Sequence, residues 1–387
     1  MTKKLFIVTG EQSGDIHASN IVKELKKLIP DIDIAGVGGN EMKKQGVNLI
    51  HDHSDMGIVG IDSLKKIPEH IKLGKNILKF LKNNFKPDLI LLIDYGGFNI
   101  RLAKYLKKNS YKIFYYIAPQ VWATRKGRLK KIARYFDKVM LIFPFEEEIH
   151  KQAGVNAEFV GHPLVTMLPE AVSKKIFCEK YNLNPEKPLV GIFPGSRKAE
   201  IHFMLEILLN AANLIQQELP DTQFILAQAT NISDDYLNKY LQKSSLNEKI
   251  NLKVLKEANY EVLSASDMLL LTSGTVTLEA AIYQTPMLLS YKSYSIAYWV
   301  YLLIRYIDKA GLPNIIMGRE IVKEFIQDKA TPDQIATEAL RILKNPGDKN
   351  KMLQDLADVK KALTNKPASV RVSEIIFEEL NLHDKNS

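Results

Sequence analysis

Short apolar runs alternate along the chain with segments whose apolar residues recur every three or four positions. The run Leu89–Ile93 is apolar at every position, which is typical of a strand buried on both faces of a sheet. Strand-like runs separated by helix-period segments such as Ile16–Leu28 indicate a parallel sheet with crossover helices. The strands predicted in the first half are Leu5–Val8, Ile34–Val37, Leu89–Ile93, Lys112–Ile117 and Lys138–Ile142.

The alternation pauses near Gly161-His162-Pro163 and starts again at Leu189. The second half has predicted strands at Leu189–Phe193, Thr222–Ala227, Ile250–Val254 and Met268–Leu271, and predicted helices from about Glu200 to Glu218, at Thr275–Tyr283 and at Pro332–Lys344. We therefore predict an α/β protein with two Rossmann-like domains, residues 1–165 and 166–345, facing across a cleft. Ligands of such folds bind at the carboxyl ends of the strands.

The last segment, residues 346–387, is predicted to be a helical tail. We expect it to pack back on the first domain or on a partner subunit, which leaves a homodimer open. The final residues, 383–387, are expected to fray.

Composition limits the classes of protein that remain. The chain has 387 residues and one cysteine, Cys178, which excludes a disulfide scaffold and a multi-cysteine metal site. No uncharged run approaches the roughly 20 residues that cross a bilayer, and the first residues do not have the pattern of a signal peptide. The expectation is a soluble or peripheral protein of the cytosol.

Positive charge is concentrated in one part of the chain. The formal net charge is +9, yet the segment Lys65–Lys138 contains 19 Lys and Arg against four acidic residues. Within it, Lys65–Lys86 has the pattern of a basic amphipathic helix, which is compatible with an anionic membrane surface. No aromatic-interleaved nucleic-acid motif is present, so we expect no nucleic-acid partner. A solvated lysine-rich surface is the alternative interpretation.

The predicted first strand ends in the loop Gly10–Asp15, which precedes a helix. Glycines allow close backbone approach, and a helix start offers N–H groups to an anion or a sugar hydroxyl. The loop does not match GxGxxG, which argues against a dinucleotide site. A plain turn with a helix cap explains it equally well. The candidate binding residues are Glu11, Ser13 and Gly14.

Two loops of the second half follow predicted strands and open helices, a combination that suits a pyrophosphate. A guanidinium in the first loop can contact phosphate in bidentate fashion. A carboxylate one turn inside the second helix can accept ribose hydroxyls. The pattern GxxxxGK[ST] is missing, which argues against P-loop hydrolysis. The candidate residues are Gly195, Ser196 and Arg197 in the first loop, and Ser273, Gly274, Thr275 and Glu279 in the second.

Asp94 ends the central apolar strand and is followed by Tyr95-Gly96-Gly97. A carboxylate at the carboxyl end of a buried strand is well placed to act as a general base. The alternative, a cap for a helix that begins near Asn99, fits Asn99 better than Asp94. Metal sites look weak: Asp31-Ile32-Asp33 precedes a strand at the end away from the cleft, and residues 51–55 (His-Asp-His-Ser-Asp) look like a hydrated loop.

Taken together, the motifs resemble those of lipid-A-disaccharide synthases, membrane-peripheral glycosyltransferases of GT-B architecture. Gly96 is a departure, because the family often has proline there. The segment Ser295–Tyr306 is unusually aromatic and is expected to be a buried helix or a lipid-contacting surface. The matching blocks are Gly10–Asp15, Met56–Val59, Ile93-Asp94 with Phe98-Asn99, Ala118–Ala123, Phe143–Glu146, Gly161–Pro163, Pro194–Arg197, Ser273–Thr275 with Leu278-Glu279, Leu312–Asn314 and Gly318–Glu320.

The resemblance implies transfer from UDP-2,3-diacylglucosamine to 2,3-diacylglucosamine 1-phosphate (lipid X), which gives the β(1→6)-linked disaccharide 1-phosphate and UDP. It implies an inverting, metal-independent reaction without a cofactor, on the cytoplasmic face of the inner membrane. Asp94 would be the general base, Arg197 and the Ser273–Thr275 loop would stabilise UDP, Glu279 would hold the ribose, and Asn314 would help to bind the donor.

Two other interpretations remain open. One is another two-domain UDP-sugar enzyme, either the peptidoglycan N-acetylglucosaminyltransferase or a non-hydrolysing UDP-sugar 2-epimerase. An epimerase needs no acceptor and acts on the UDP-sugar alone. The other is a non-catalytic protein that binds anionic lipids or nucleotides, which would leave the paired anion-binding loops without a purpose.

Overall fold

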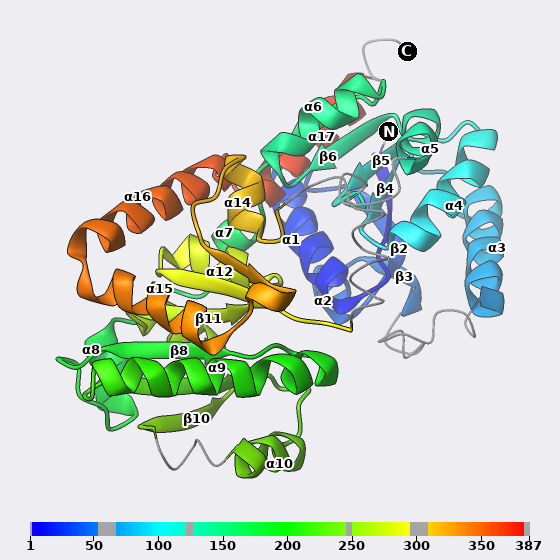
Figure 1. Ribbon diagram of the computed structural model, residues 1–387. Coiled ribbons are helices and arrows are strands. Elements are labelled where there is room, and N and C mark those ends of the chain that lie inside the picture. Colours follow the sequence, from blue (N-terminus) through cyan, green and yellow to red (C-terminus); the bar gives the residue numbers. More distant parts are fainter. Residues whose placement is uncertain (1, 53–66, 121–126, 245–249, 295–308, 383–387) are drawn as a thin grey trace. The chain divides into compact units, whose positions relative to one another are not determined.

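The computed structural model describes residues 2–52, 67–120, 127–244, 250–294 and 309–382, and its residues divide into two compact units (Figure 1). Unit 1 comprises Met1–Pro163 and Leu363–Ser387, and unit 2 comprises Leu164–Ala362. Each unit has one parallel sheet connected by helices, which confirms the predicted α/β class. No helix in these ranges is both long and apolar enough to span a membrane.

The sheet of unit 1 has the strand order β3-β2-β1-β4-β5-β6-β7, with parallel pairing throughout. All five strands that the apolar pattern predicts are present. The pattern missed β3 and β7, which form the two edges and are half exposed or only three residues long. The strands are β1 (Lys4–Val8), β2 (Asp33–Gly38), β3 (Asn48–Asp52), β4 (Leu89–Ile93), β5 (Ile113–Tyr116), β6 (Lys138–Leu141) and β7 (Ala157–Phe159).

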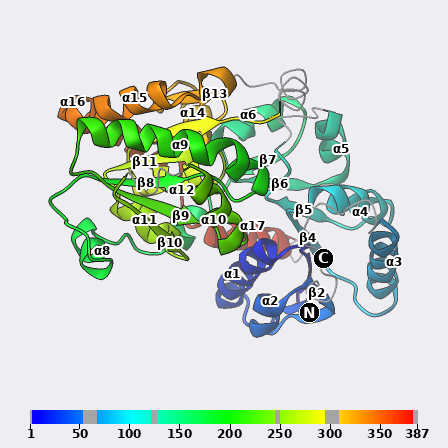
Figure 2. The same ribbon diagram turned by 60° about the horizontal axis from the view of Figure 1, so that its bottom comes forward.

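Helices cover both faces of this sheet (Figure 2). One face packs against α3, α4 and α5, and the other packs against α1, α2 and α17. The helices of unit 1 are α1 (Gln12–Leu28), α2 (Asn40–Lys44), α3 (Ile67–Asn83), α4 (Gly96–Lys108), α5 (Gly127–Tyr135), α6 (Pro144–Gln152) and α17 (Ala368–Leu382). β4 lies between the two layers with every residue buried, as its uniform apolar sequence predicts.

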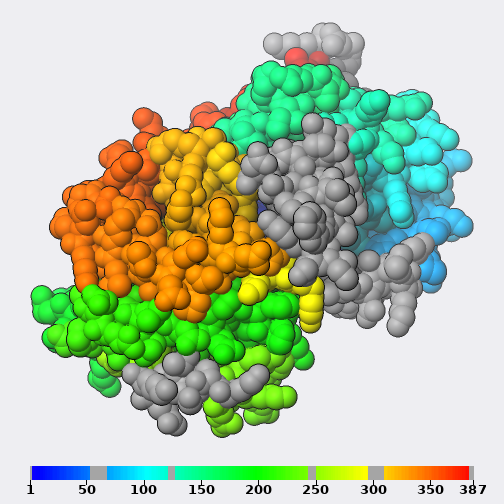
Figure 3. Space-filling model, in the orientation of Figure 1, coloured from blue at the N-terminus to red at the C-terminus, as the bar shows by residue number. Residues whose placement is uncertain are grey.

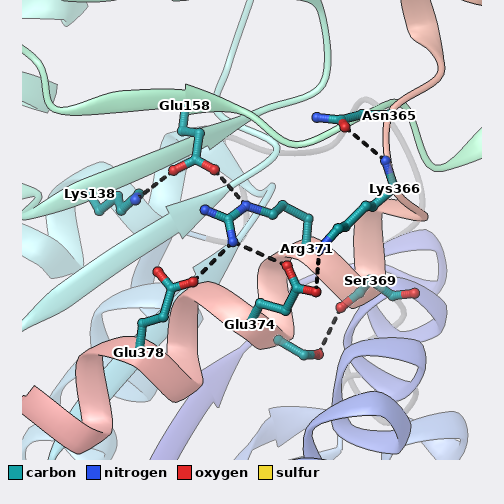
Figure 4. Close-up of polar contacts among 9 residues, drawn as sticks. Lys138, Glu158, Asn365, Lys366, Ser369, Arg371, Glu374 and Glu378 are labelled. Atoms are coloured by element: carbon teal, nitrogen blue, oxygen red, sulfur yellow. Dashed lines mark hydrogen bonds and ion pairs between the residues drawn. The ribbon is translucent and has the colours of Figure 1, made fainter.

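The C-terminal helix α17 packs on α1 of its own chain. Its buried Val372 and Ile376 belong to the same core as Ile21 and Leu25 of α1. Charged residues also join α17 to the edge strand β7 of the sheet (Figure 4). Arg371 pairs with Glu158 of β7 at 2.7 Å and with two acids of its own helix. A segment more than 200 residues away in the sequence thereby completes the core of the first unit.

The sheet of unit 2 has the order β10-β9-β8-β11-β12-β13, again parallel. The four strands predicted from the sequence are present, and the pattern missed β12 and β13. The strands are β8 (Leu189–Phe193), β9 (Gln223–Gln228), β10 (Leu252–Lys256), β11 (Met268–Thr272), β12 (Met287–Tyr291) and β13 (Glu324–Ile326).

Long helices flank this second sheet. The helices α9 and α15 lie side by side, and their green and orange side chains adjoin in Figure 3. The helices of unit 2 are α7 (Leu164–Met167), α8 (Lys174–Lys180), α9 (Lys198–Glu218), α10 (Asp234–Ser244), α11 (Asn259–Ala265), α12 (Val276–Tyr283), α14 (Leu312–Met317), α15 (Pro332–Lys344) and α16 (Pro346–Leu363).

The predicted helical tail consists of two helices that belong to different units. α16 lies with unit 2, where the sulfur of Met352 accepts the Met287 N–H and Asp355 pairs with Arg319 at 2.5 Å. α17 belongs to unit 1. The contacts therefore divide the chain after Pro163 and after Ala362, whereas the sequence pattern suggested boundaries at 165 and 345.

Candidate functional site

Strand order brings the candidate motifs of each unit together. In unit 1 the chain builds β1 to β3 in one direction and then returns to place β4 on the other side of β1. The Gly10–Glu11 turn follows β1 and Asp94 follows β4, and these strands are neighbours with Val8 beside Leu92. Such a reversal of strand order opens a crevice at the carboxyl ends, where α/β proteins bind ligands.

Unit 2 repeats this arrangement. Its chain builds β8 to β10 and then places β11 on the other side of β8. The loop Pro194–Arg197 follows β8, and the loop Ser273–Thr275 follows β11, with Phe193 paired to Leu271 at the strand ends. The two loops proposed to hold an anion therefore lie at the same switch point of one sheet.

The backbone of Asp94 has an unusual conformation and is firmly held. Its φ is +47°, in the left-handed region that non-glycine residues seldom adopt. Its N–H donates to the Tyr116 carbonyl at 2.9 Å. Its carbonyl accepts from Asn99 Nδ2 at 2.8 Å and from the Tyr115 hydroxyl at 2.9 Å. Strained residues held by several bonds are frequent at functional sites.

This geometry corrects the expectation that a helix begins near Asn99. The helix α4 begins at Gly96, and Tyr95 occupies the N-cap position. Asn99 is fully buried inside the helix, and its Nδ2 reaches back to the carbonyls of Ile93 and Asp94. Two consecutive left-handed residues, Asp94 and Tyr95, turn the chain sharply enough to start the helix three residues earlier than expected.

The carboxyl group of Asp94 sits in an environment that favours its neutral form. Burial raises its pKa, the charge of nearby Glu11 raises it further, and a hydrogen bond from the Tyr95 backbone opposes the shift. The loop after β1 and the loop after β4 are thus electrostatically coupled. A carboxylate with a raised pKa is a stronger proton acceptor than a solvated one.

Tyr95 links the two loops to helix α3. A Cβ atom at Gly10 would overlap the Tyr95 ring, so the turn after β1 needs glycine to let the aromatic side chain approach. The Tyr95 hydroxyl shares a hydrogen bond with Nε2 of His70 on α3. Burial and Glu11 raise the pKa of Tyr95 to about 12, so this phenol is protonated at neutral pH.

The predicted loop Gly10–Asp15 is shorter than expected, because α1 begins at Gln12 rather than near Ile16. Ser13 and Gly14 therefore lie in the first turn of the helix, and Glu11 is its N-cap residue. Asp15 does not face a ligand: its buried carboxylate accepts three backbone N–H groups at the start of α2, from Gly39, Glu41 and Met42.

A half-buried histidine, His17, and a buried one, His162, lie at the same end of the sheet. His17 of α1 packs edge-on against Tyr116, with ring centroids 6.2 Å apart, and His162 packs against Phe143 at 5.1 Å. Burial lowers the pKa of His17 to about 4. Burial, together with the charge of His17, lowers the pKa of His162 to about 3. Both imidazoles are therefore neutral at physiological pH.

A groove of about 790 Å³ opens beside this site, among α3, α4 and α5. Its lining is largely apolar, and it reaches Tyr95, the neighbour of Asp94. Ile71 in this groove is 55% exposed. Four cations also line it, Lys75, Arg101, Lys104 and Lys131. The basic amphipathic helix predicted at Lys65–Lys86 is present as α3.

The first candidate anion-binding loop of unit 2, Pro194–Arg197, is built around a carboxylate. Glu200 Oε2 accepts the N–H groups of Ser196 at 2.8 Å and Arg197 at 3.1 Å. Glu200 Oε1 accepts from Arg197 Nη1 at 2.7 Å. The Ser196 amide was expected to donate to a bound anion, but it donates to Glu200 instead. The Arg197 side chain, by contrast, is 77% exposed.

The second loop, Ser273–Thr275, keeps two of its three backbone donors available, because the Ser273 amide donates to the Ser290 carbonyl at 3.1 Å. The amides of Gly274 and Thr275 have no acceptor within the described ranges, and both residues are exposed before the first turn of α12. Thr272 Oγ1, at the end of β11, is buried without a hydrogen-bond partner in the same ranges. Glu279 lies one turn inside α12 as predicted, and burial raises its pKa.

Asn314 lies in α14 and is buried. Its Nδ2 donates to the Val322 carbonyl and to Glu324 Oε1, and its Oδ1 accepts the N–H groups of Ile321 and Val322. The side chain therefore holds the segment before β13. Glu324 also accepts the N–H groups of Ala310 and Gly311, and the Ala310 carbonyl accepts from the Ser273 hydroxyl at 3.2 Å.

Gly96, where the resemblance suggests proline, lies against Pro119, whose ring a Cβ atom at this position would overlap. Asp33 is the first residue of β2, at the amino end of the sheet. His51 and Asp52 end strand β3 and do not lie in a loop as expected. Across the described ranges, no three His, Cys, Asp or Glu are placed to hold a metal ion. Residues 53–59, 121–123, 295–306 and 383–387 lie outside those ranges.

Several residues at the site were not predicted from the sequence. Tyr115 and Tyr116 looked like ordinary strand residues, and His70 looked like part of a helix face. Glu200 could have been found, because the spacing Arg197-x-x-Glu200 matches the three-residue interval of a capping box.

Known solved structures share this fold. The UDP-GlcNAc 2-epimerase from Neisseria meningitidis, solved with UDP-GlcNAc, has a TM-score of 0.60 at 14% identity, covering 98% of this chain and 100% of that chain. A glycosyltransferase from Rickettsia africae has a TM-score of 0.54 at 12% identity, covering 98% of each. At these identities the likeness establishes the fold alone, and it confirms the GT-B architecture.

Sequence comparison is more specific. The family model for lipid-A-disaccharide synthetase matches residues 5–377. A lipid-A-disaccharide synthase from Geobacter metallireducens is 38% identical over 378 residues, which cover 98% of this chain and 97% of that protein. One from Coxiella burnetii is 33% identical over 374 residues, which cover 97% and 98%. The chain belongs to the lipid-A-disaccharide synthetase family and is a glycosyltransferase of lipid A biosynthesis.

Proposed function

We propose that the enzyme transfers 2,3-diacylglucosamine from its UDP derivative to 2,3-diacylglucosamine 1-phosphate, with Asp94 as general base. The observation that carries this proposal is the placement of Asp94. The residue ends the central strand of unit 1 at the switch point of the sheet, in a strained and well-anchored conformation. Burial and Glu11 both raise its pKa, which suits a group that must accept a proton.

The chemical step is a single displacement. Asp94 takes the proton of the acceptor 6-hydroxyl while that oxygen attacks the anomeric carbon of the donor sugar. The bond from the anomeric carbon to the diphosphate oxygen breaks, and UDP leaves with the electron pair. Attack from the face opposite the leaving group inverts the anomeric centre, which accounts for a β-linked product.

Negative charge grows on the diphosphate as this bond breaks. The exposed guanidinium of Arg197 and the amides of Gly274 and Thr275 at the start of α12 are the donors that would stabilise it. A fixed donor of this kind contributes about 2.7–4 kcal/mol to a transition state. Glu279, one turn further along α12, is the proposed acceptor for the ribose hydroxyls.

The groove among α3, α4 and α5 suits the acceptor. Its apolar lining matches an acyl chain, and its cationic residues Lys75, Arg101 and Lys104 match a sugar phosphate. Tyr95, which adjoins the proposed base, is one of the residues that line the groove. The same cations and the exposed Ile71 would attach the enzyme peripherally to the anionic cytoplasmic face of the inner membrane, where both lipid substrates reside.

Incubation with UDP-2,3-diacylglucosamine and lipid X tests the proposal directly. Mass spectrometry should detect the tetraacyl disaccharide 1-phosphate and UDP in equal amounts. The variant Asp94→Ala should form no disaccharide while its UDP affinity stays within a few-fold of the wild type. Near-normal turnover by this variant would show that another group takes the proton.

The likeness to a UDP-GlcNAc 2-epimerase makes epimerisation the second candidate. An epimerase converts a water-soluble UDP-sugar without an acceptor. A glycosyltransferase, by contrast, needs the acceptor. We expect UDP-N-acetylglucosamine alone to remain unchanged, as judged by NMR of the sugar ring, when the enzyme is present at the concentration that completes disaccharide formation.

A further inference from the structure

Glu200 occupies the centre of the turn that precedes α9. Its carboxylate accepts two backbone N–H groups, from Ser196 and Arg197, and one guanidinium N–H from Arg197. The Glu200 side chain is 9% exposed, whereas that of Arg197 is 77% exposed. A buried carboxylate therefore holds both the backbone amide and one guanidinium nitrogen of Arg197, while most of the arginine side chain is exposed to solvent.

The turn is shaped to admit this carboxylate. Gly195 has a φ of +113°, which L-residues rarely adopt, and a Cβ atom there would lie 2.5 Å from Glu200 Oε2. Asn231 holds the other side of the turn, because its Nδ2 donates to the Ser196 carbonyl at 2.7 Å. The backbone of the turn is thus fixed from both sides, and the direction of Arg197 is fixed with it.

A guanidinium carries five N–H donors, and the bond to Glu200 uses one on Nη1. The donors on Nε and Nη2 make no bond within the described ranges. An exposed arginine without a tether populates many rotamers, and binding an anion would have to restrict them. The tether removes much of this freedom in advance and leaves a planar pair of donors for an incoming diphosphate.

We propose that Glu200 is a positioning residue for Arg197, which it holds ready for the diphosphate of the UDP-sugar. This inference rests on the proposed function, in which Arg197 contacts the leaving group. It also changes how the loop works. Because Glu200 already occupies the amides of Ser196 and Arg197, the loop acts on the anion through the guanidinium, and the backbone amides that reach the anion come from Gly274 and Thr275.

The test measures UDP affinity by isothermal titration calorimetry in a double-mutant cycle of Arg197→Ala and Glu200→Gln. Glutamine keeps the length of the side chain, but its single carbonyl oxygen cannot accept from both amides and from the guanidinium at once. We expect Glu200→Gln to weaken UDP binding about tenfold, and the double variant to bind within about twofold of Arg197→Ala alone. The value of kcat should fall as well, since charge grows on the diphosphate during the reaction.

Glu206→Gln is the matched control, because Glu206 is exposed on the same helix and the substitution removes the same charge. It should leave UDP affinity unchanged. Glu200→Asp provides a second variant in case the glutamine variant does not fold. It keeps the charge but is one methylene too short to reach the guanidinium, so its UDP affinity should also fall.

Each other outcome has a distinct meaning. Tighter UDP binding by Glu200→Gln would show that the carboxylate competes with the ligand. A lower melting temperature with unchanged UDP affinity would show that Glu200 only stabilises the turn and does not position Arg197. Additive losses in the cycle would show that it does not act through Arg197. All three overturn the inference and leave the proposed function intact. Unchanged binding by Arg197→Ala would instead remove this loop from the proposed donor site, and the inference with it.

Discussion

Asparagine at position 94 would remove the proposed proton acceptor and leave the surrounding structure almost untouched. Asparagine is isosteric with aspartate and tolerates the left-handed region, where φ of Asp94 is +47°. The three backbone hydrogen bonds of the residue, to Tyr116, Asn99 and Tyr115, do not involve its side chain. Alanine would add backbone strain of about 1–2 kcal/mol, so Asp94→Asn isolates the chemistry better.

The expected loss in rate follows from the role of a general base. Proton transfer to a positioned side chain contributes about 10²–10⁴-fold, which corresponds to about 3–5 kcal/mol in activation free energy. We expect kcat for disaccharide formation to fall by this factor in Asp94→Asn. The dissociation constant for UDP should change less than about threefold, because UDP binds through loops of unit 2 in the proposed mechanism.

Folding stability should change in the opposite direction. The pKa of Asp94 is raised in the folded state, so the fold favours the neutral carboxyl group. That contribution is complete below the ordinary pKa of 3.8 and is lost as the pH rises through the folded value. Asparagine cannot ionise and keeps it. Urea denaturation should therefore show Asp94→Asn to be more stable than the wild type at pH 8, with a smaller difference at pH 5.

Asp31→Asn is the matched control for both measurements. Asp31 is an exposed residue that precedes β2, at the amino end of the strands, far from the carboxyl end where Asp94 lies. Its loss should change neither rate nor stability. A wild-type rate in Asp94→Asn would refute the assignment of the base, and a variant less stable than the wild type at pH 8 would refute the electrostatic argument.

Three further predictions concern other parts of the molecule. Glu279→Ala should weaken UDP binding about tenfold by calorimetry, and unchanged affinity would remove the ribose contact. Ile376→Ala should lower the free energy of unfolding by about 2–5 kcal/mol in urea denaturation, because its fully buried side chain joins α17 to α1; a loss below 1 kcal/mol would show that α17 contributes little to this core. Reversing Lys75, Arg101 and Lys104 to glutamate should reduce binding to vesicles that contain anionic lipid by at least about tenfold in a flotation assay, as 0.5 M salt should for the wild type; equal binding by this variant would place the membrane contact elsewhere.

The alternation of apolar runs and helical segments predicted most of the fold. Strands such as β4 and β11 were found because they are buried on both faces and therefore apolar at every position. Three of the four missed strands, β3, β7 and β13, lie at sheet edges. The fourth, β12, is a buried inner strand that the prediction overlooked. Short or half-exposed edge strands need few apolar residues, so their sequences resemble loops.

Helix starts were the weakest part of the prediction. Both α1 and α4 begin earlier than expected, at Gln12 and Gly96, and their first two residues are small or polar. In α4 the start depends on the left-handed conformations of Asp94 and Tyr95. Hydrogen bonds from Tyr115 and Asn99 maintain the left-handed conformation of Asp94. Such bonds join separate elements, so no local sequence pattern predicts them.

The sequence by itself determined the class of fold, the order of its strands along the chain, and the loops that carry the candidate chemistry. Those properties follow from local patterns of burial and from residue types that suit an anion or a proton. Only the tertiary structure decided that Glu11 acts on the charge of Asp94, that Glu200 already fills the turn beside Arg197, and that the C-terminal helix α17 completes the first unit. These three interactions depend on which groups the folded chain brings within hydrogen-bonding or electrostatic range, and the distance between residues along the sequence does not determine which groups those are.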